Sequence, residues 1–221
     1  MTLKEKRELI KLLSNYVTDA RLNKMKDVLG RRTRYLTLVM EDIYQAQNAS
    51  AVLRSCECFG VQDIHIIENR NAYQVNPDVA LGANKWLTIH KYNKAEHNTL
   101  DCLNALKSRG YKLIATTPHK DDCLLEELPL DQKTALLFGT ELKGLSEEAI
   151  LMADGFMKIS MAGFTESFNI SVSAAICLYH LAPRIRKEVK NWQLTEAEHT
   201  DILLEWLMGS VKHAQTLIRK R

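Results

Sequence analysis

The chain has 221 residues, a length that suits one domain with extensions. Hydrophobic residues make up 46% of it, enough to bury a core, which argues against global disorder. The net charge is only +3 but unevenly spread, with ten Lys and Arg against four Asp and Glu in residues 1–34, twelve against eighteen in 35–182, and eight against five in 183–221. Basic ends suit a polyanion such as RNA, and a solvated helical surface explains them equally well.

The cysteines and the N-terminus bear on the compartment. Five cysteines are an odd number, and no CxxC pair or zinc-like His spacing accompanies them, so we expect reduced thiols and no structural metal. The first residues are charged throughout and have no apolar h-region, so we expect no signal peptide. No apolar run approaches the ~18–20 residues that span a bilayer. These features predict a cytoplasmic protein without a membrane partner.

The N-terminal segment predicts helices followed by a basic break. Residues 4–13 and 19–29 have the spacing of short amphipathic helices. The break that follows Gly30 carries a cluster of Arg31, Arg32 and Arg34. We interpret residues 1–34 as a basic helical extension.

From residue 35 onward, short apolar runs alternate with helical patterns. The runs are typical of buried parallel strands, and glycines end two of the helices. The predicted strands are 36–40, 64–67, 112–116, 135–138 and 156–159, and the predicted helices are 48–59, 98–109, 146–152 and 170–182. A capping box that begins at Thr195 then opens a long C-terminal helix.

This alternation predicts an α/β domain over residues 35–182, with a mainly parallel sheet and helices on both faces. Residues 183–221 form a helical C-terminal extension in this interpretation. Because open α/β sheets bind ligands at the carboxyl ends of their strands, the loops after the third, fourth and fifth strands are the candidate site.

Two common nucleotide-binding motifs are absent. The loop between Gly139 and Gly144 resembles a P-loop superficially, but Leu145 stands where the phosphate-binding lysine is required. No GxGxxG follows a predicted strand, so the dinucleotide fingerprint is missing too. What remains is a glycine-bounded loop, which either lets backbone approach a ligand or simply makes a tight turn.

Two helix starts carry polar side chains with open interpretations. Ser167, Asn169 and Ser171 stand where a strand leads into a helix, so they bind a ligand or merely cap the helix. Asn48 and Arg54 lie six residues apart at the start of another helix, and a lone arginine there is most often a surface ion pair.

Three segments together resemble a known family. They are NASAVLR at 48–54, FGTELKGLS at 138–146, and ISM at 159–161 followed by SFNISVSAA at 167–175. In this order they resemble the three motifs of the SpoU branch of the SPOUT RNA 2′-O-ribose methyltransferases. Ser160, Phe168 and Ile170 depart from the usual Pro, Leu and Val of the third motif.

The resemblance implies a fold, a cofactor and a partner. The fold is a parallel sheet with a C-terminal trefoil knot, and the family acts as a homodimer. The cofactor is S-adenosylmethionine, held mostly by backbone atoms of the motif loops, and no metal is required. Carried onto this sequence, the cofactor residues are Thr116, Gly139, Ile159, Ser167 and Phe168.

The resemblance also implies catalytic roles. We expect Arg54 to bind RNA phosphate and stabilise the developing alkoxide, because a guanidinium keeps its proton and is a poor base. Asn169 would position the ribose, Ser167 would support the loop, and Glu141 would pair with Asn48. Arg31, Arg32 and Arg34 are the further candidates for RNA binding.

The substrate follows from a closer similarity. GANKW at 82–86, SEEA at 146–149 and ADG at 153–155 resemble the members that methylate the D-loop guanosine at position 18 of tRNA. Two alternatives stay open: methylation of rRNA or of another tRNA position, and an RNA-binding module that has lost catalysis.

Overall fold

A computed structural model of the chain describes residues 1–117 and 123–219. It divides into two compact units. The first joins Met1–Thr33 to the C-terminal residues from Gln193 onward, and the second is Arg34–Trp192.

The larger unit is built on a parallel sheet. Within the described residues the strand order is β3-β2-β1-β6-β4-β7-β5, and every pairing between neighbours is parallel. This confirms the expected α/β class with a mainly parallel sheet. The strands are β1 (Leu36–Glu41), β2 (Asp63–Ile67), β3 (Thr88–Tyr92), β4 (Lys112–Thr116), β5 (Cys123–Leu124), β6 (Thr134–Phe138) and β7 (Gly155–Lys158).

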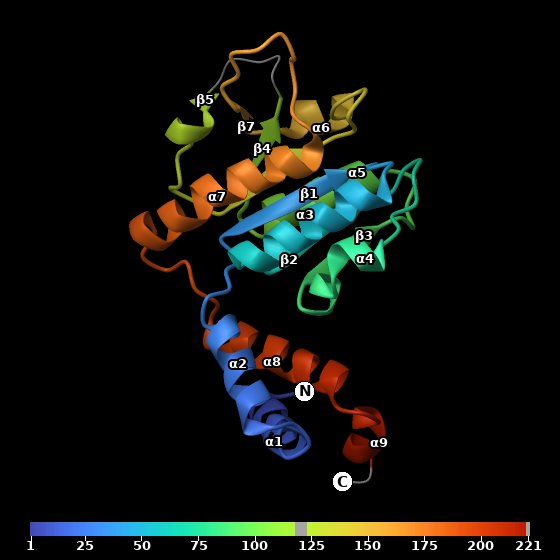
Figure 1. Cartoon of the computed structure of the whole chain (residues 1–221), viewed down its shortest axis with the longest axis vertical. Helices are drawn as coiled ribbons and strands as arrows, with labels where there is room; N and C mark the ends of the chain where they lie inside the picture. The colour runs from blue at the N-terminus through green and yellow to red at the C-terminus, as the bar shows by residue number, and fades with distance from the viewer. Residues whose placement is uncertain (118–122, 220–221) are drawn as a thin grey trace. The chain divides into compact units, whose positions relative to one another are not determined.

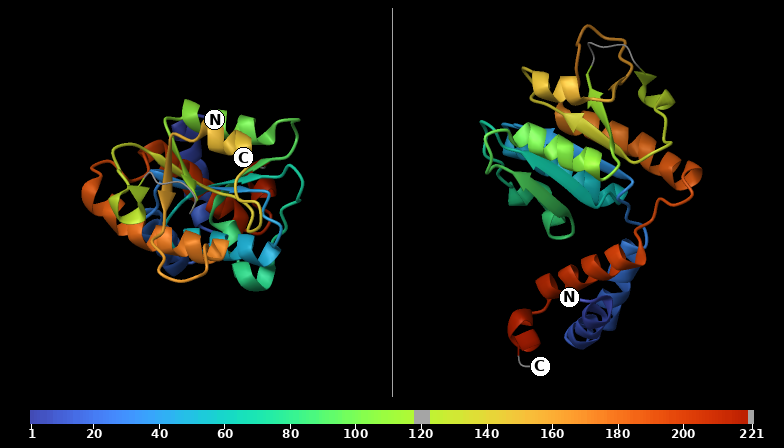
Figure 2. Two further views of the ribbon diagram at one scale, coloured as in Figure 1. Left: turned by 90° about the horizontal axis from the view of Figure 1, so that it is seen from above. Right: turned by 180° about the vertical axis from the view of Figure 1, so that it is seen from behind.

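Helices cover both faces of this sheet. On one face, α3 (Ala46–Phe59) packs against α7 (Ile170–Glu188), as Figure 1 shows. On the other face lie α5 (Asn98–Ser108) and α6 (Glu147–Met152), seen from behind in Figure 2. The shorter helices are α4 (Pro77–Ala80), η1 (Ala83–Lys85) and η2 (Leu125–Glu127).

The alternation of β1 side chains separates two apolar layers. Leu38 and Met40 pack into the core beneath α3 and α7, whereas Val39 packs with Leu103 and Leu106 of α5. All of these side chains are nearly inaccessible to solvent. Because period-two alternation directs successive side chains to opposite faces, β1 is a central strand buried on both sides.

The ends of two helices show where local sequence rules apply. Gly60 ends α3 in the left-handed region, with φ of +82°, as a glycine stop predicts. In contrast, α7 continues through Pro183 to Glu188, beyond the predicted end at residue 182. Ile185, in that extra turn, is buried in the core, and this packing extends the helix past the proline.

The smaller unit combines both ends of the chain. Its helices are α1 (Leu3–Ser14), α2 (Asp19–Leu29), α8 (Glu196–Ser210) and α9 (Ala214–Arg219). Leu13, Leu29 and Leu207 are buried here, and α1 and α2 both pack against α8. Ion pairs join Lys6 to Asp201 and Arg7 to Glu196. The N-terminal extension and the C-terminal residues from Gln193 onward therefore fold as one helical unit, whereas residues 183–192 of the predicted C-terminal extension belong to the larger unit.

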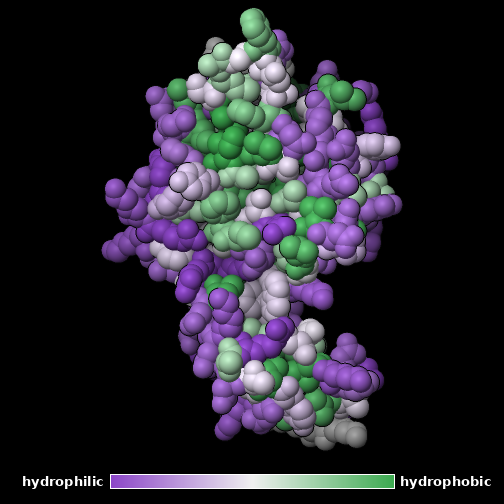
Figure 3. All heavy atoms as spheres, in the orientation of Figure 1, coloured by the Kyte–Doolittle hydropathy of each residue, from purple (hydrophilic) through white to green (hydrophobic). Residues whose placement is uncertain are grey.

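A patch of apolar side chains is exposed on α7. Val172 is 44% exposed and Tyr179 is 74% exposed. Figure 3 shows apolar residues gathered over this helix on the face turned to the viewer. Such a cluster is typical of a surface that binds another protein.

The cysteines are free thiols. Cys56, Cys102 and Cys177 are buried, Cys123 is half-buried and Cys58 is exposed. Burial raises the pKa of the Cys177 thiol to about 12, so this side chain is an inert part of the core.

No helix among the residues that the structure describes is long and apolar enough to cross a membrane.

Candidate cofactor pocket and catalytic residues

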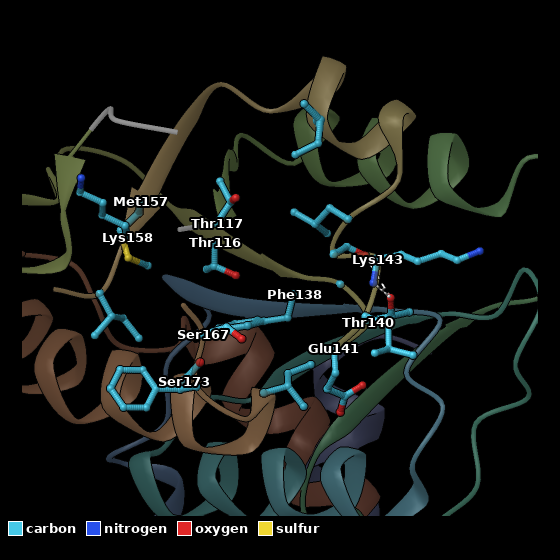
Figure 4. Close-up of a pocket in the computed structure, with 18 of the residues that line it drawn as sticks. Thr116, Thr117, Phe138, Thr140, Glu141, Lys143, Met157, Lys158, Ser167 and Ser173 are labelled. Carbon is cyan, nitrogen blue, oxygen red and sulfur yellow. Dashed lines mark hydrogen bonds between the residues drawn. The ribbon is translucent and has the colours of Figure 1, made fainter. Parts of the chain in front are cut away.

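A cavity of about 390 Å³ opens at the carboxyl ends of β4, β6 and β7. It lies where an open α/β sheet is expected to bind a ligand. Thr116 and Thr117 line one wall, opposite Phe138 and Ser167 (Figure 4). The structure brings together all five residues predicted to bind the cofactor, namely Thr116, Gly139, Ile159, Ser167 and Phe168.

The loop after β6 forms a wall of this cavity through its backbone. Thr140 and Gly144 exchange two main-chain hydrogen bonds of 3.0 and 2.9 Å, and the main-chain N–H of Lys143 donates to Thr140 Oγ1 at 3.1 Å (Figure 4). A Cβ on Gly139 would lie 2.1 Å from the Gly144 carbonyl carbon. Only glycine therefore fits at position 139, because any side chain there would collide with the backbone of the same loop.

Further lining residues were missed in the sequence analysis. Each lies at a strand end or on the first turn of α7, close in sequence to a predicted residue, and that proximity was the available signal. They are Thr117, Phe138, Met157, Lys158, Ile170 and Ser173.

An amide network joins the three motifs beside the cavity. Asn48 Nδ2 donates to Gln45 Oε1 at 3.0 Å and also to Glu141, the pairing expected from sequence. Asn169 Nδ2 donates to Asn48 Oδ1 at 3.1 Å, while Asn169 Oδ1 accepts from the Ser171 main-chain N–H at 2.9 Å. Asn169 is thus both the N-cap of α7 and the bridge from the third motif to the first.

Arg54 lies apart from this network within the chain. It is exposed on α3 and is not among the residues that line the cavity. Within residues 1–117 and 123–219 it makes no hydrogen bond or ion pair. A surface ion pair, the alternative interpretation of Arg54, therefore lacks an acidic partner among the described residues.

The three arginines of the basic cluster have different surroundings. Arg31 is exposed. Arg32 is 1% exposed and its guanidinium lies 5.5 Å from the centre of the Trp206 ring, so the structure corrects its expected place on an RNA-facing surface. Arg34 belongs to the larger unit, where its Nε donates to Asp63 at 2.9 Å.

A buried polar cluster lies on β2 and β3, away from the cavity. Asp63, His65 and His90 bring potential metal ligands within 4.8 Å of one another. Burial opposes ionisation of Asp63, but His90 and the charges of Arg34 and Arg109 lower its pKa well below the usual range. Because Arg34 and Arg109 already compensate this carboxylate, the local charge disfavours a cation. Burial lowers the pKa of His65 to about 3.

Comparison with known proteins identifies the class. Residues 35–179 match the model of the SpoU rRNA Methylase family, so the chain belongs to this family and is a methyltransferase of that class. The resemblance predicted from the three motifs is confirmed.

Two relatives with the same description are similar to this chain over most of its length. The chain is 43% identical over 206 residues to a tRNA (guanosine(18)-2′-O)-methyltransferase of Borreliella burgdorferi, a match that covers 93% of each chain. A protein of the same description from Thermus thermophilus is 33% identical, with 86% of this chain and 97% of that protein covered.

Among solved structures, a TrmH/SpoU tRNA modifying enzyme of A. aeolicus has a TM-score of 0.78 at 27% identity, covering 88% of this chain and 98% of that one. The SpoU methyltransferase AviRb of Streptomyces viridochromogenes, solved with AdoMet, shares the fold at 23% identity and a TM-score of 0.61, covering 73% of this chain and 64% of that one.

Proposed function

We propose that this chain transfers a methyl group from S-adenosylmethionine to the ribose 2′-hydroxyl of guanosine 18 in the D loop of tRNA. The observation that carries the proposal is a cavity formed by the second and third family motifs. Relatives described with this activity align with nearly the whole chain, which supports the choice of substrate.

The cavity suits S-adenosylmethionine in size and chemistry. A volume of about 390 Å³ lies within the ~300–1,000 Å³ of small-molecule sites. Phe138, Leu145 and Ile159 offer apolar contacts, and Gly139 and Gly144 line the cavity without side chains. When bound, this cofactor supplies a methyl group already activated on a sulfonium, which requires no metal.

The polar residues beside the cavity would align the substrate. Asn169 is held by Asn48 and Ser171, so its amide is in place to position the ribose. Glu141 holds Asn48, and Ser167 supports the loop that carries Phe168. Such alignment can contribute several kcal/mol to an in-line displacement.

Arg54 would act as a cation. Its guanidinium retains its proton in proteins, so we assign it to RNA phosphate and to the alkoxide that develops as the hydroxyl loses its proton. The hydroxyl proton passes to solvent, and S-adenosylhomocysteine is the leaving group.

We propose that a second copy of the chain completes the site. Arg54 is exposed and outside the cavity of its own chain, so a homodimer in which it approaches the partner's cavity accounts for both facts. The exposed Val172 and Tyr179 on α7 mark the proposed interface. Family membership further supports a C-terminal trefoil knot.

RNA binding is assigned to exposed cations. Arg31 and Arg54 are exposed and remain candidates for phosphate contacts. Arg32 stacks on Trp206 and Arg34 pairs with Asp63, so we assign both to holding their own units together. We assign the protein to the cytoplasm, as a tRNA substrate supports.

Methyl transfer tests the proposal. The protein is first titrated with S-adenosylmethionine in a calorimeter, and then incubated with labelled cofactor and either unmodified tRNA or rRNA. We expect cofactor binding and label in tRNA. Label in rRNA alone would establish the alternative substrate, and RNA binding without any transfer would establish a non-catalytic module.

A further inference from the structure

A buried carboxylate stands at the carboxyl end of β1. Glu41 is 3% exposed, and no Lys, Arg or His in the described part of the chain forms an ion pair with it. Its carboxylate instead accepts three hydrogen bonds. Thr99 Oγ1 donates at 2.6 Å, Ser146 Oγ at 2.7 Å and the Ser146 main-chain N–H at 2.9 Å.

This arrangement is a poor way to gain stability. Removing a carboxylate from water costs several kcal/mol, and hydrogen bonds only offset that cost. Hydrogen bonds to a charged acceptor are short and directional, however, so they hold their donors in a defined place.

Ser146 directly follows the loop that forms a wall of the cofactor cavity. Gly144 and Leu145, the two residues before it, line the cavity. Ser146 Oγ also accepts from the Ala149 N–H at 3.1 Å as the N-cap of α6. Donating to Glu41 and accepting from Ala149, this hydroxyl fixes the end of the loop to β1 and to α6.

The start of the same loop is attached to β1 as well. Phe138, the last residue of β6, pairs with Met40 of β1, and Gly139 follows it. One end of the cofactor loop is therefore anchored by strand pairing, and the other by the carboxylate one residue further along β1.

We infer that Glu41 is a positioning residue for S-adenosylmethionine binding, which anchors the loop 139–145 through Ser146. The inference rests on the proposed function. Glu41 touches neither the cofactor cavity nor the substrate, and acts through the position of Gly144 and Leu145.

Glu41→Gln is the informative variant. The glutamine keeps only one acceptor atom and loses the charge. Whichever way its amide turns, the NH2 group faces either the Ser146 N–H or the Thr99 and Ser146 hydroxyls, all of which donate to Glu41. We expect at least about a tenfold weaker affinity for S-adenosylhomocysteine, the demethylated form of the cofactor, which serves as the probe. This is the scale of one lost hydrogen bond to a charged group. Ser146→Ala, which keeps the main-chain donor, should weaken binding less.

Asp42→Asn is the matched control. It removes one negative charge at the adjacent position, where Asp42 Oδ1 accepts from the main-chain N–H groups of Asn69 and Arg70 in a different loop. We expect this variant to bind S-adenosylhomocysteine as the parent does.

The experiment combines calorimetry with hydrogen exchange of the ligand-free protein. Glu41→Gln should speed exchange of the Gly144 and Ser146 amides and raise the Kd, while the KM for tRNA changes little. Parental Kd and exchange in Glu41→Gln would overturn the inference, as would an equal loss in Asp42→Asn. If Glu41→Gln does not fold, parental exchange and Kd in Ser146→Ala would overturn it. A parent protein that binds no cofactor would instead refute the proposed function.

Discussion

Gly139→Ala is the most direct perturbation of the cavity wall. The added Cβ would lie 2.1 to 2.3 Å from the Gly144 carbonyl group and the Leu145 nitrogen, whereas ordinary contact begins at 3.4 Å. All three atoms belong to the backbone, so no side chain can rotate away. The wall must move by more than 1 Å, which breaks the hydrogen-bond pair between Thr140 and Gly144.

Two effects follow from this displacement. The loss of two hydrogen bonds lowers the free energy of unfolding by ~2 kcal/mol. A displacement of this size at a binding wall should weaken S-adenosylmethionine about tenfold or more. Urea unfolding and calorimetry measure the two effects. Gly163→Ala is the control, because the nearest atom to its Cβ, Thr165 N, lies 3.9 Å away. Parental cofactor affinity in Gly139→Ala would refute the assignment of this loop to the cofactor site.

Three further predictions concern the catalytic cation, the dimer and pH. Arg54→Ala should reduce single-turnover methyl transfer by about 100-fold or more with unchanged cofactor affinity. Arg54→Lys should also be impaired, but should be more active than the alanine variant. A lysine variant that reaches full activity at high pH would mean that Arg54 is a base. Tyr179→Arg should give monomers in light scattering, and these should be inactive in methyl transfer. Mixed dimers of one Arg54→Ala chain and one Gly139→Ala chain should regain activity at one of their two sites. An active monomer contradicts both expectations. Because the folded pKa of His65 is about 3 against an ordinary 6.5, only the unfolded chain binds this proton between these values. Stability should therefore fall as pH drops below about 6.5, by up to ~1.4 kcal/mol per pH unit, and less steeply in His65→Phe; equal slopes in urea unfolding would contradict this.

The sequence was most informative where chemistry is local. Buried strands such as β1 and β6 show as continuous apolar runs, and Gly60 marks a helix end by its backbone conformation. The cavity residues could be predicted because strand-end loops and the family motifs coincide. β3 escaped prediction because its residues, TIHKY, are largely half-exposed and mix polar with apolar side chains.

Long-range contacts account for what the sequence could not predict. From the sequence, Arg32 resembles a surface cation. In the structure its guanidinium lies over the ring of Trp206, which is far along the chain. The two chain ends likewise form one unit only because α1 and α2 pack on α8. Glu41 looks like the polar end of a strand, and its role depends on Thr99 and Ser146, which only the fold brings to it.

The nucleotide that receives the methyl group tests the central claim most directly. Unmodified tRNA is incubated with the protein and S-adenosylmethionine, digested, and mapped by mass spectrometry, beside a transcript in which guanosine 18 is replaced. We expect one 2′-O-methylated nucleotide, guanosine 18, and no product on the replaced transcript. Methylation at another nucleotide, or on the base instead of the ribose, would contradict it.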